Sequence, residues 1–179
     1  MLFRSVAIGE HNKLLVSNIT AEDVVEISEV RCALELQAAE TIVTRNPLSP
    51  LTAKRLRHIN DKIRETIVTK SYQENFKLED EFHFLIVDSA DNKRLSDIYR
   101  QIHLLIVRAR WLSLFYPHFE KTPGEHMAMI EGLEKRDLQK TLEAVRIHMG
   151  GASHHFSRVF TDKDMQVAAQ AFGSIFGSR

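Results

Sequence analysis

A carboxylate and an imidazole stand one helical turn apart in the segment Leu78-Glu79-Asp80-Glu81-Phe82-His83. The segment continues into apolar Leu85, Ile86 and Val87, which is typical of a helix with one buried face. Residues four apart on a helix share a face, with Cβ atoms about 5 to 6 Å apart. Glu79 and His83 could therefore bind one cation or hydrogen bond to each other.

Two later histidines have a spacing that places them together. His126 lies eleven residues before Asp137, where a turn between two helices is expected, and His148 lies eleven residues after it. At a rise of 1.5 Å per residue, both are then about 16 Å from the turn. In an antiparallel helix pair the two imidazoles can face each other.

The same count applies to a second expected turn, near Asp91. Glu79 and His103 each lie twelve residues from Asp91, and His83 and Tyr99 each lie eight residues from it, so each pair is expected at one level. Glu79 and His83, together with His126 and His148, offer one carboxylate and three imidazoles. Such a set suits a divalent Zn, Ni, Fe or Mn ion. Helix bundles commonly build such sites in their cores. The alternative is that these histidines only pack and hydrogen bond, as single core histidines usually do.

Five further histidines are assigned less specific roles. We expect His11, His58 and His118 to lie on the surface, in loops or on polar faces. His154 and His155 follow a double glycine and could contribute to the site. They are not included in the expected ligand set.

The elements that must position these residues are helices. The chain has 7 glycines and 4 prolines, and residues 51–116 contain neither. We expect an all-α antiparallel bundle of six to seven helices with short connections. The first helix is capped by Thr20 and runs to about Arg45, and the second begins at Ser49-Pro50. The third ends near residues 89–91, and the fourth begins at Asn92 and stops before Pro117. The fifth begins at Thr122-Pro123, with Thr122 as its cap and Pro123 in its first turn, and the sixth runs from Asp137 to about Phe160.

Composition excludes several classes of protein. A chain of 179 residues is most simply one domain. Lysine plus arginine and aspartate plus glutamate number 24 each, so no net positive charge draws the chain to nucleic acid. The single Cys32 cannot form an internal disulfide, and no apolar stretch approaches the ~18 residues that cross a bilayer. We expect a soluble, cytoplasmic protein with no membrane partner.

Several motifs, in this order, resemble the ligand-binding FCD domain of FadR-subfamily GntR transcription regulators. The resemblance covers roughly residues 20–160 and rests on five groups of residues: Glu29-Val30-Arg31 with Leu34-Glu35 and Ala38-Ala39; Leu78 to His83; Ser89-Ala90-Asp91-Asn92 with Leu95; Glu125-His126 with Ile130, Gly132, Leu133 and Asp137; and Ala144 with His148.

The resemblance implies a helical bundle that forms homodimers and binds a small effector, usually a carboxylate-bearing metabolite. Many members of this family bind a divalent metal through an aspartate, a histidine one turn later and two more histidines. The matching residues here are Glu79, His83, His126 and His148. Glutamate replaces the usual aspartate, and Asp80, three residues before His83, is an alternative ligand.

Arg31 matches a family arginine that points towards the pocket, where its guanidinium could pair bidentately with an effector carboxylate. An ordinary ion pair with Glu35, one turn later, is the alternative. Tyr99 and His103 are expected beside the same pocket from their spacing and not from family identity. Either could instead be a packed, hydrogen-bonded residue.

Residues 1–19 are interpreted as an arm or the remnant of a wing and linker, residues 20–160 as the FCD-like domain, and residues 161–179 as a C-terminal helix or tail. The family's winged helix-turn-helix has no room before the first helix, so DNA is expected as a partner only through such a domain. The leading hypothesis is an effector-sensing, metal-binding dimerisation domain without catalytic activity. A metal-dependent hydrolase on a helical bundle is the alternative, with Asp80 or Glu125 as its general base.

Overall fold

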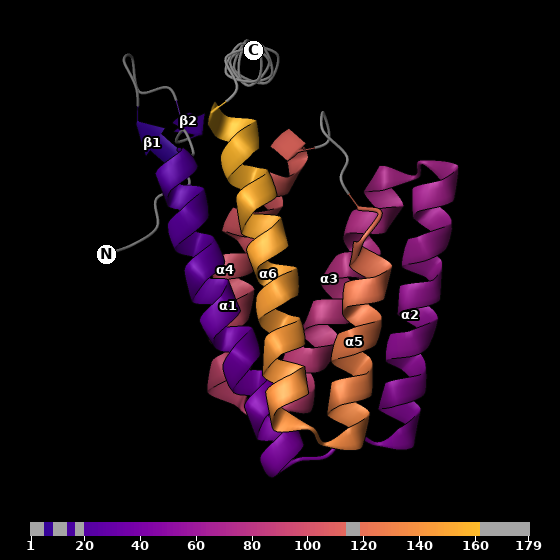
Figure 1. The fold of residues 1–179 in the computed structure, drawn as a ribbon. Helices are drawn as coiled ribbons and strands as arrows, with labels where there is room; N and C mark the ends of the chain where they lie inside the picture. The colour runs from indigo at the N-terminus through magenta and orange to yellow at the C-terminus, as the bar shows by residue number, and fades with distance from the viewer. Residues whose placement is uncertain (1–5, 9–13, 17–19, 114–118, 162–179) are drawn as a thin grey trace.

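The computed structural model describes residues 6–8, 14–16, 20–113 and 119–161, with side chains over residues 20, 22–107 and 119–151. The described helices run side by side (Figure 1). They are α1 (Ala21–Thr44), α2 (Pro50–Thr69), α3 (Tyr72–Ser89), α4 (Lys93–Ser113), α5 (Thr122–Lys135) and α6 (Leu138–Thr161). Strands β1 (Val6–Ile8) and β2 (Leu14–Val16) pair antiparallel, with Val6 opposite Val16. The predicted all-helical bundle is confirmed, with a small hairpin ahead of it. The tail beyond residue 161, predicted as a short helix or a frayed end, lies outside the described residues.

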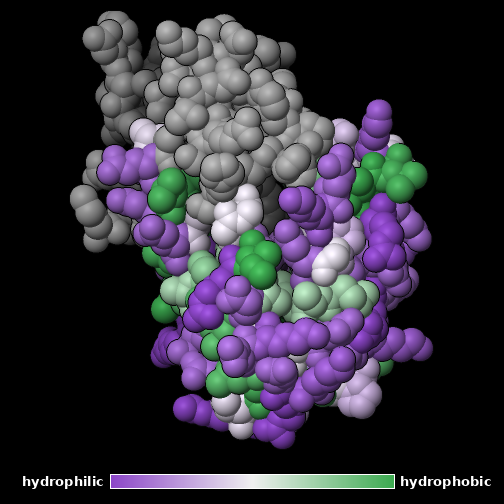
Figure 2. All heavy atoms as spheres, viewed as in Figure 1, coloured by the Kyte–Doolittle hydropathy of each residue, from purple (hydrophilic) through white to green (hydrophobic). Residues whose placement is uncertain are grey.

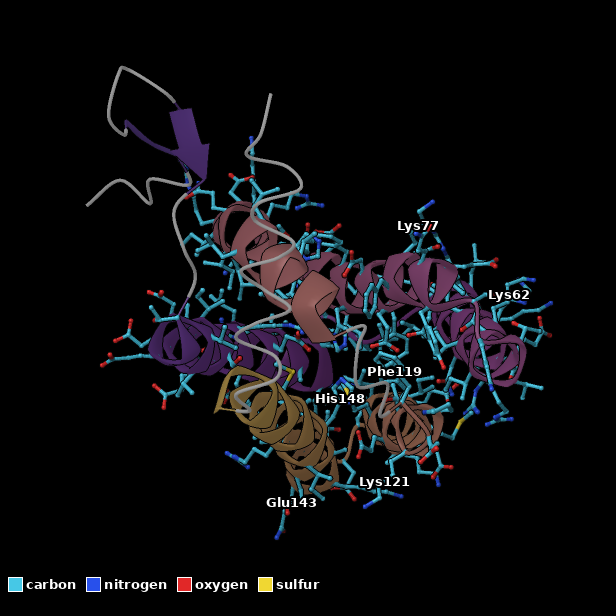
Figure 3. All side chains as sticks on the ribbon, turned by 90° about the horizontal axis from the view of Figure 1, so that it is seen from above. Lys62, Lys77, Phe119, Lys121, Glu143 and His148 are labelled. Atoms are coloured by element: carbon cyan, nitrogen blue, oxygen red, sulfur yellow. The ribbon has the colours of Figure 1, made fainter. Side chains whose placement is uncertain are left out.

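Around the bundle the helices follow one another in the order α1, α4, α3, α2, α5, α6, as the view along their axes shows (Figure 3). Helix α6 packs against α1 on one side and α5 on the other, and α2 lies between α3 and α5. Helix α1 also contacts α3 across the bundle. Side chains from α1, α3, α5 and α6 can therefore meet at one point.

The first two helices begin where their capping residues predict. The Thr20 hydroxyl accepts a hydrogen bond from the Asp23 amide (3.1 Å), and the Asp23 carboxylate accepts one from the Thr20 amide (2.8 Å), which completes a capping box. Ser49 accepts from the Thr52 amide (3.0 Å), with Pro50 in the first turn. These local bonds satisfy amide groups that have no partner within the helix.

Later helix starts agree with the sequence, with one correction. Asn92 accepts from the Leu95 amide (3.2 Å) and Asp137 from the Lys140 amide (3.0 Å), as N-caps do. Thr122 was expected to cap α5, but it is that helix's first residue, and Lys121 is the cap without a side-chain bond. The reason is that the Thr122 amide already bonds the Phe119 carbonyl (3.1 Å), so the chain turns one residue earlier.

The core is built mainly from aliphatic side chains of all six described helices. Its fully buried members include Ile42, Leu56, Ile63, Phe82, Ile86, Tyr99, Met129, Ile130 and Leu133. Two large apolar side chains on these helices are not covered by the core, because Val30 on α1 and Ile98 on α4 are each 47% exposed.

Helices α5 and α6 approach closely at Gly132. A Cβ atom at this position would lie 2.6 Å from Thr141 Oγ1 and 3.0 Å from the Thr141 backbone N and Cα. Only a residue without a side chain permits this approach. The contact closes the hairpin that carries His126 and His148.

The face drawn in Figure 2 is covered largely by hydrophilic side chains, with hydrophobic residues in separate small groups. Exposed large hydrophobic residues of the described part include Leu51, Val68, Leu104 and Ile147. None of the described helices combines the length and the apolar character that crossing a bilayer requires.

Candidate metal centre

Four side chains converge inside the bundle. Glu79 and His83 come from α3, His126 from α5 and His148 from α6, and each offers a donor atom within 4.8 Å of the others. All four residues are buried. Seen along the helix axes, His148 points towards the centre of the bundle, whereas Glu143 on the same helix points outward (Figure 3).

The donor atoms are close enough to share one ion. His83 Nε2 and His148 Nε2 are 3.1 Å apart, and Glu79 Oε2 is 3.8 Å from both His83 Nε2 and His126 Nε2. Nitrogen and oxygen ligands bind Zn²⁺ at about 2.0 to 2.2 Å, so two of them on one ion are at most roughly 4 Å apart. These three separations meet this limit, and donor atoms up to 4.8 Å apart would need only a small side-chain movement to share an ion, so this residue set fits a divalent ion.

Two carboxylates hold the outer nitrogens of the histidine pair. Glu35 Oε2 on α1 lies 2.7 Å from His83 Nδ1, and Glu125 Oε2 on α5 lies 3.0 Å from His148 Nδ1. A carboxylate at Nδ1 favours a proton there and leaves the Nε2 lone pair directed at the centre. Two such lone pairs 3.1 Å apart repel each other, and a cation bound between them would relieve this repulsion. This arrangement is what metal-binding histidines require from their surroundings.

Burial shapes the charge state of the pair formed by Glu35 and His83. Burial lowers the pKa of the His83 imidazole to about 3, and the Glu35 carboxylate opposes only part of that effect. Burial raises the pKa of Glu35, but the charge of Arg31 and the hydrogen bonds from His83 and Tyr99 outweigh it and hold this pKa well below its ordinary value. At neutral pH, His83 is therefore a neutral imidazole, which is the form that binds a metal ion.

A buried arginine network adjoins the cluster. Arg31 Nε donates to Glu35 Oε1 (2.8 Å) and to the Tyr99 hydroxyl (3.0 Å), and that hydroxyl donates to Glu35 Oε1 (2.7 Å). The Arg31 side chain is 5% exposed, yet its Nη2 has no hydrogen-bond partner among the described residues. The ion pair with Glu35 is thus present, and Nη2 is a hydrogen-bond donor with no acceptor among these residues.

The alternative carboxylate does not join the cluster. Asp80 Oδ2 lies 3.2 Å from His103 Nε2 on α4, whereas Glu79 faces His83 and His126. The expected pairing of Glu79 with His103 is therefore wrong. Equal distances from a turn set the level of two residues along the helix axes but not their direction around them. Neighbouring residues of a helix point about 100° apart, and α4 lies on the Asp80 side of α3.

The remaining sequence expectations have mixed outcomes. His126 and His148 do face each other, with ring centroids 4.6 Å apart, and His83 and Tyr99 meet through Glu35. His58 is exposed, as predicted. The predictions for His11 and His118 concern residues outside the described part, as do the side chains of His154 and His155.

The roles of Glu35 and Glu125 beside the histidines were not predicted from the sequence. Glu125 had a signal: it stands twelve residues before Asp137, almost level with His148 eleven residues after it. Glu35 had a weaker one, because it follows Arg31 by one helical turn and shares its face. Its contact with His83 depends on how α1 crosses α3, which local pattern does not contain.

The FCD domain family matches residues 26–151 of this chain. The chain belongs to the FCD domain family. This FCD domain is 26% identical over 156 residues to an uncharacterized HTH-type transcriptional regulator, YdhC of Bacillus subtilis (strain 168), a match that covers 86% of this chain and 68% of that protein. The relationship groups it with transcription regulators.

Solved structures share the fold of this FCD domain at low sequence identity. Escherichia coli McbR/YncC superposes with a TM-score of 0.79 at 13% identity, over 87% of this chain and 78% of that one. A structure described as "Lar controls the expression of the Listeria monocytogenes agr system and mediates virulence" gives a TM-score of 0.69 at 13% identity, over 86% of this chain and 73% of that one. These two likenesses concern the fold alone.

Proposed function

We propose that this FCD domain is the effector-sensing and dimerisation domain of a GntR-type transcription regulator, and that it binds one divalent metal ion through Glu79, His83, His126 and His148. The observation that carries the proposal is the convergence of these four buried donors within 4.8 Å. Three imidazoles and a carboxylate suit Zn, Ni, Fe or Mn. When bound, such an ion supplies open coordination positions to a ligand oxygen.

The effector we propose is a small carboxylate-bearing metabolite. Its best-supported partner is Arg31, whose buried Nη2 lies next to the cluster and has no hydrogen-bond partner among the residues that the structure describes. Tyr99 and His103 remain in the proposed effector site, although each already has a protein partner, Glu35 and Asp80 respectively. Binding an anion there needs a charged donor in a dry environment, which Arg31 provides.

We propose that regulation works through binding and not turnover. Two copies of the domain would pair, and metal and effector would bias the arrangement of attached DNA-reading domains. Such coupling requires that the effector binds two arrangements of the pair with different affinity. Support for pairing comes from Val30 and Ile98, apolar positions of the packed helices α1 and α4 that the single chain leaves partly exposed.

Elemental analysis of protein purified without immobilised metal tests the metal site. We expect one equivalent of a first-row metal, either as purified or after Zn²⁺ addition and gel filtration. His126→Ala and His148→Ala should lose it, because each removes a ligand atom. His58→Ala is the matched control, since it removes an exposed histidine of α2 and should keep the metal. Wild-type protein that retains no ion under these conditions would contradict the proposal.

A further inference from the structure

Glu35 connects the histidine cluster to the arginine network. It is fully buried on α1, and both of its oxygens accept hydrogen bonds. Oε2 lies 2.7 Å from His83 Nδ1, while Oε1 accepts from Arg31 Nε (2.8 Å) and from the Tyr99 hydroxyl (2.7 Å). A carboxylate with partners on both oxygens has its position and orientation fixed.

This fixed carboxylate determines which nitrogen of His83 carries the proton. An ionised carboxylate only accepts hydrogen bonds, so the nitrogen that faces it must carry a hydrogen. His83 Nδ1 faces Glu35, and His83 Nε2 faces Glu79 and His148. The neutral ring then presents an unprotonated Nε2 to the centre of the cluster.

We propose that Glu35 is the positioning residue of this centre: it holds His83 in the Nδ1-protonated tautomer, with Nε2 directed at the other ligands, and Arg31 and Tyr99 in turn hold Glu35. The consequence for metal affinity rests on the proposed function above. The tautomer itself does not, because it is a property of the protein without metal.

Glu125 occupies the matching place beside His148 but is held much less firmly. Its side chain is 21% exposed, whereas that of Glu35 is fully buried, and among the described residues its carboxylate has one hydrogen-bond partner, His148 Nδ1 at 3.0 Å. It also lines a surface pocket of about 430 Å³ together with Lys121 and Ile147. Water can replace lost contacts at Glu125, but it has no access to Glu35.

The difference makes Glu35→Gln and Glu125→Gln a matched pair. A carboxamide has one acceptor oxygen and one NH₂ donor. At position 35, both carboxylate oxygens accept hydrogen bonds, one from His83 and the other from Arg31 and Tyr99. Whichever way the amide is oriented, its NH₂ group therefore faces another hydrogen-bond donor. At position 125, the amide oxygen can still accept from His148 Nδ1. Outer-shell substitutions typically weaken metal binding about 10- to 100-fold, and we expect this range for Glu35→Gln and a clearly smaller effect for Glu125→Gln.

Two measurements test the proposal. Nitrogen-15 NMR of the metal-free wild type, with long-range coupling to ring protons, should show His83 protonated at Nδ1 and unprotonated at Nε2. Chelator competition with Zn²⁺ then ranks wild type, Glu125→Gln, Tyr99→Phe and Glu35→Gln in order of falling affinity, and thermal unfolding confirms that each variant is folded.

The outcomes separate this proposal from the metal site itself. A wild type whose His83 is protonated at Nε2, or a folded Glu35→Gln with unchanged Zn²⁺ affinity, would overturn the role of Glu35. Wild type that binds no Zn²⁺ while His83 shows the expected tautomer would instead overturn the metal site. If Glu35→Gln does not fold, the wild-type tautomer and the affinity of Tyr99→Phe still decide the question.

Discussion

Replacing Gly132 by alanine should destabilise the domain, although alanine is the better helix former. The added Cβ would stand 3.0 Å from the backbone N and Cα of Thr141 and 2.6 Å from its hydroxyl oxygen. That hydroxyl cannot easily turn away, because it donates to the Asp137 carbonyl at 2.6 Å. Relief therefore requires α5 and α6 to move apart at the closed end of their hairpin.

The size of the effect follows from two opposing contributions. Overpacking in a tight interior typically costs about 1 to 3 kcal/mol. Alanine regains roughly 0.5 to 1 kcal/mol of backbone entropy and helix propensity over glycine. The net loss is then about 1 to 2 kcal/mol, which in a domain of this size lowers Tm by about 2 to 8 °C.

Gly150 on α6 provides the control for the same substitution. Nothing lies within 4 Å of a Cβ built there, and the residue is exposed in a continuous helix. Gly150→Ala should therefore stabilise the domain by roughly 0.5 to 1 kcal/mol. Urea unfolding of the two variants measures both changes. Equal shifts of the same sign would refute the close approach of α5 and α6 at Gly132.

Two further predictions concern pH and assembly. With a pKa of about 3 in the folded chain and about 6.5 unfolded, His83 binds its proton more readily in the unfolded state, so stability falls as the pH falls through this window. In urea unfolding with EDTA, His83→Gln should reduce the slope of unfolding free energy against pH by about 1.4 kcal/mol per unit near pH 5. His58→Gln should leave the slope unchanged, and an unchanged slope in both would contradict the assignment. Ile98→Glu should convert a dimer to a monomer in light scattering, because it places a charge in an apolar contact; a wild-type monomer would rule this out.

Much of the fold could be predicted because its signals are local. Thr20, Ser49, Asn92 and Asp137 each bond the amide three residues ahead, so residue type and spacing are sufficient to locate the helix starts. The start of α5 was misplaced by one residue, since a backbone bond from Thr122 to Phe119 decides it. Backbone bonds of that kind leave no mark on side-chain identity.

The contacts of the candidate site that could be predicted are those between two helices joined by one short turn. The pairing of His126 with His148 follows from one short turn and straight helices. The failure to pair Glu79 with His103 shows what is missing, namely the rotation of each helix about its own axis. That rotation depends on which neighbours a helix packs against, and α3 has α1, α2 and α4 around it. Contacts such as Glu35 with His83 therefore need the tertiary arrangement.

The cluster is hard to explain as a device for stability. Arg31, Glu35 and Glu79 are at least nine-tenths buried, and they share the interior with three histidines, while most other buried side chains are apolar. Removing charged groups from water costs several kcal/mol per ion, and well-packed apolar residues of similar volume often give an equally stable or more stable protein. A bundle that needed only to fold would have no physical reason to contain this arrangement. Its features have a common explanation if the interior is built to receive a cation and an anion. Carboxylates hold the outer nitrogens of His83 and His148, the inner nitrogens are directed at one point, and an arginine nitrogen beside them has no partner within the described part of the chain.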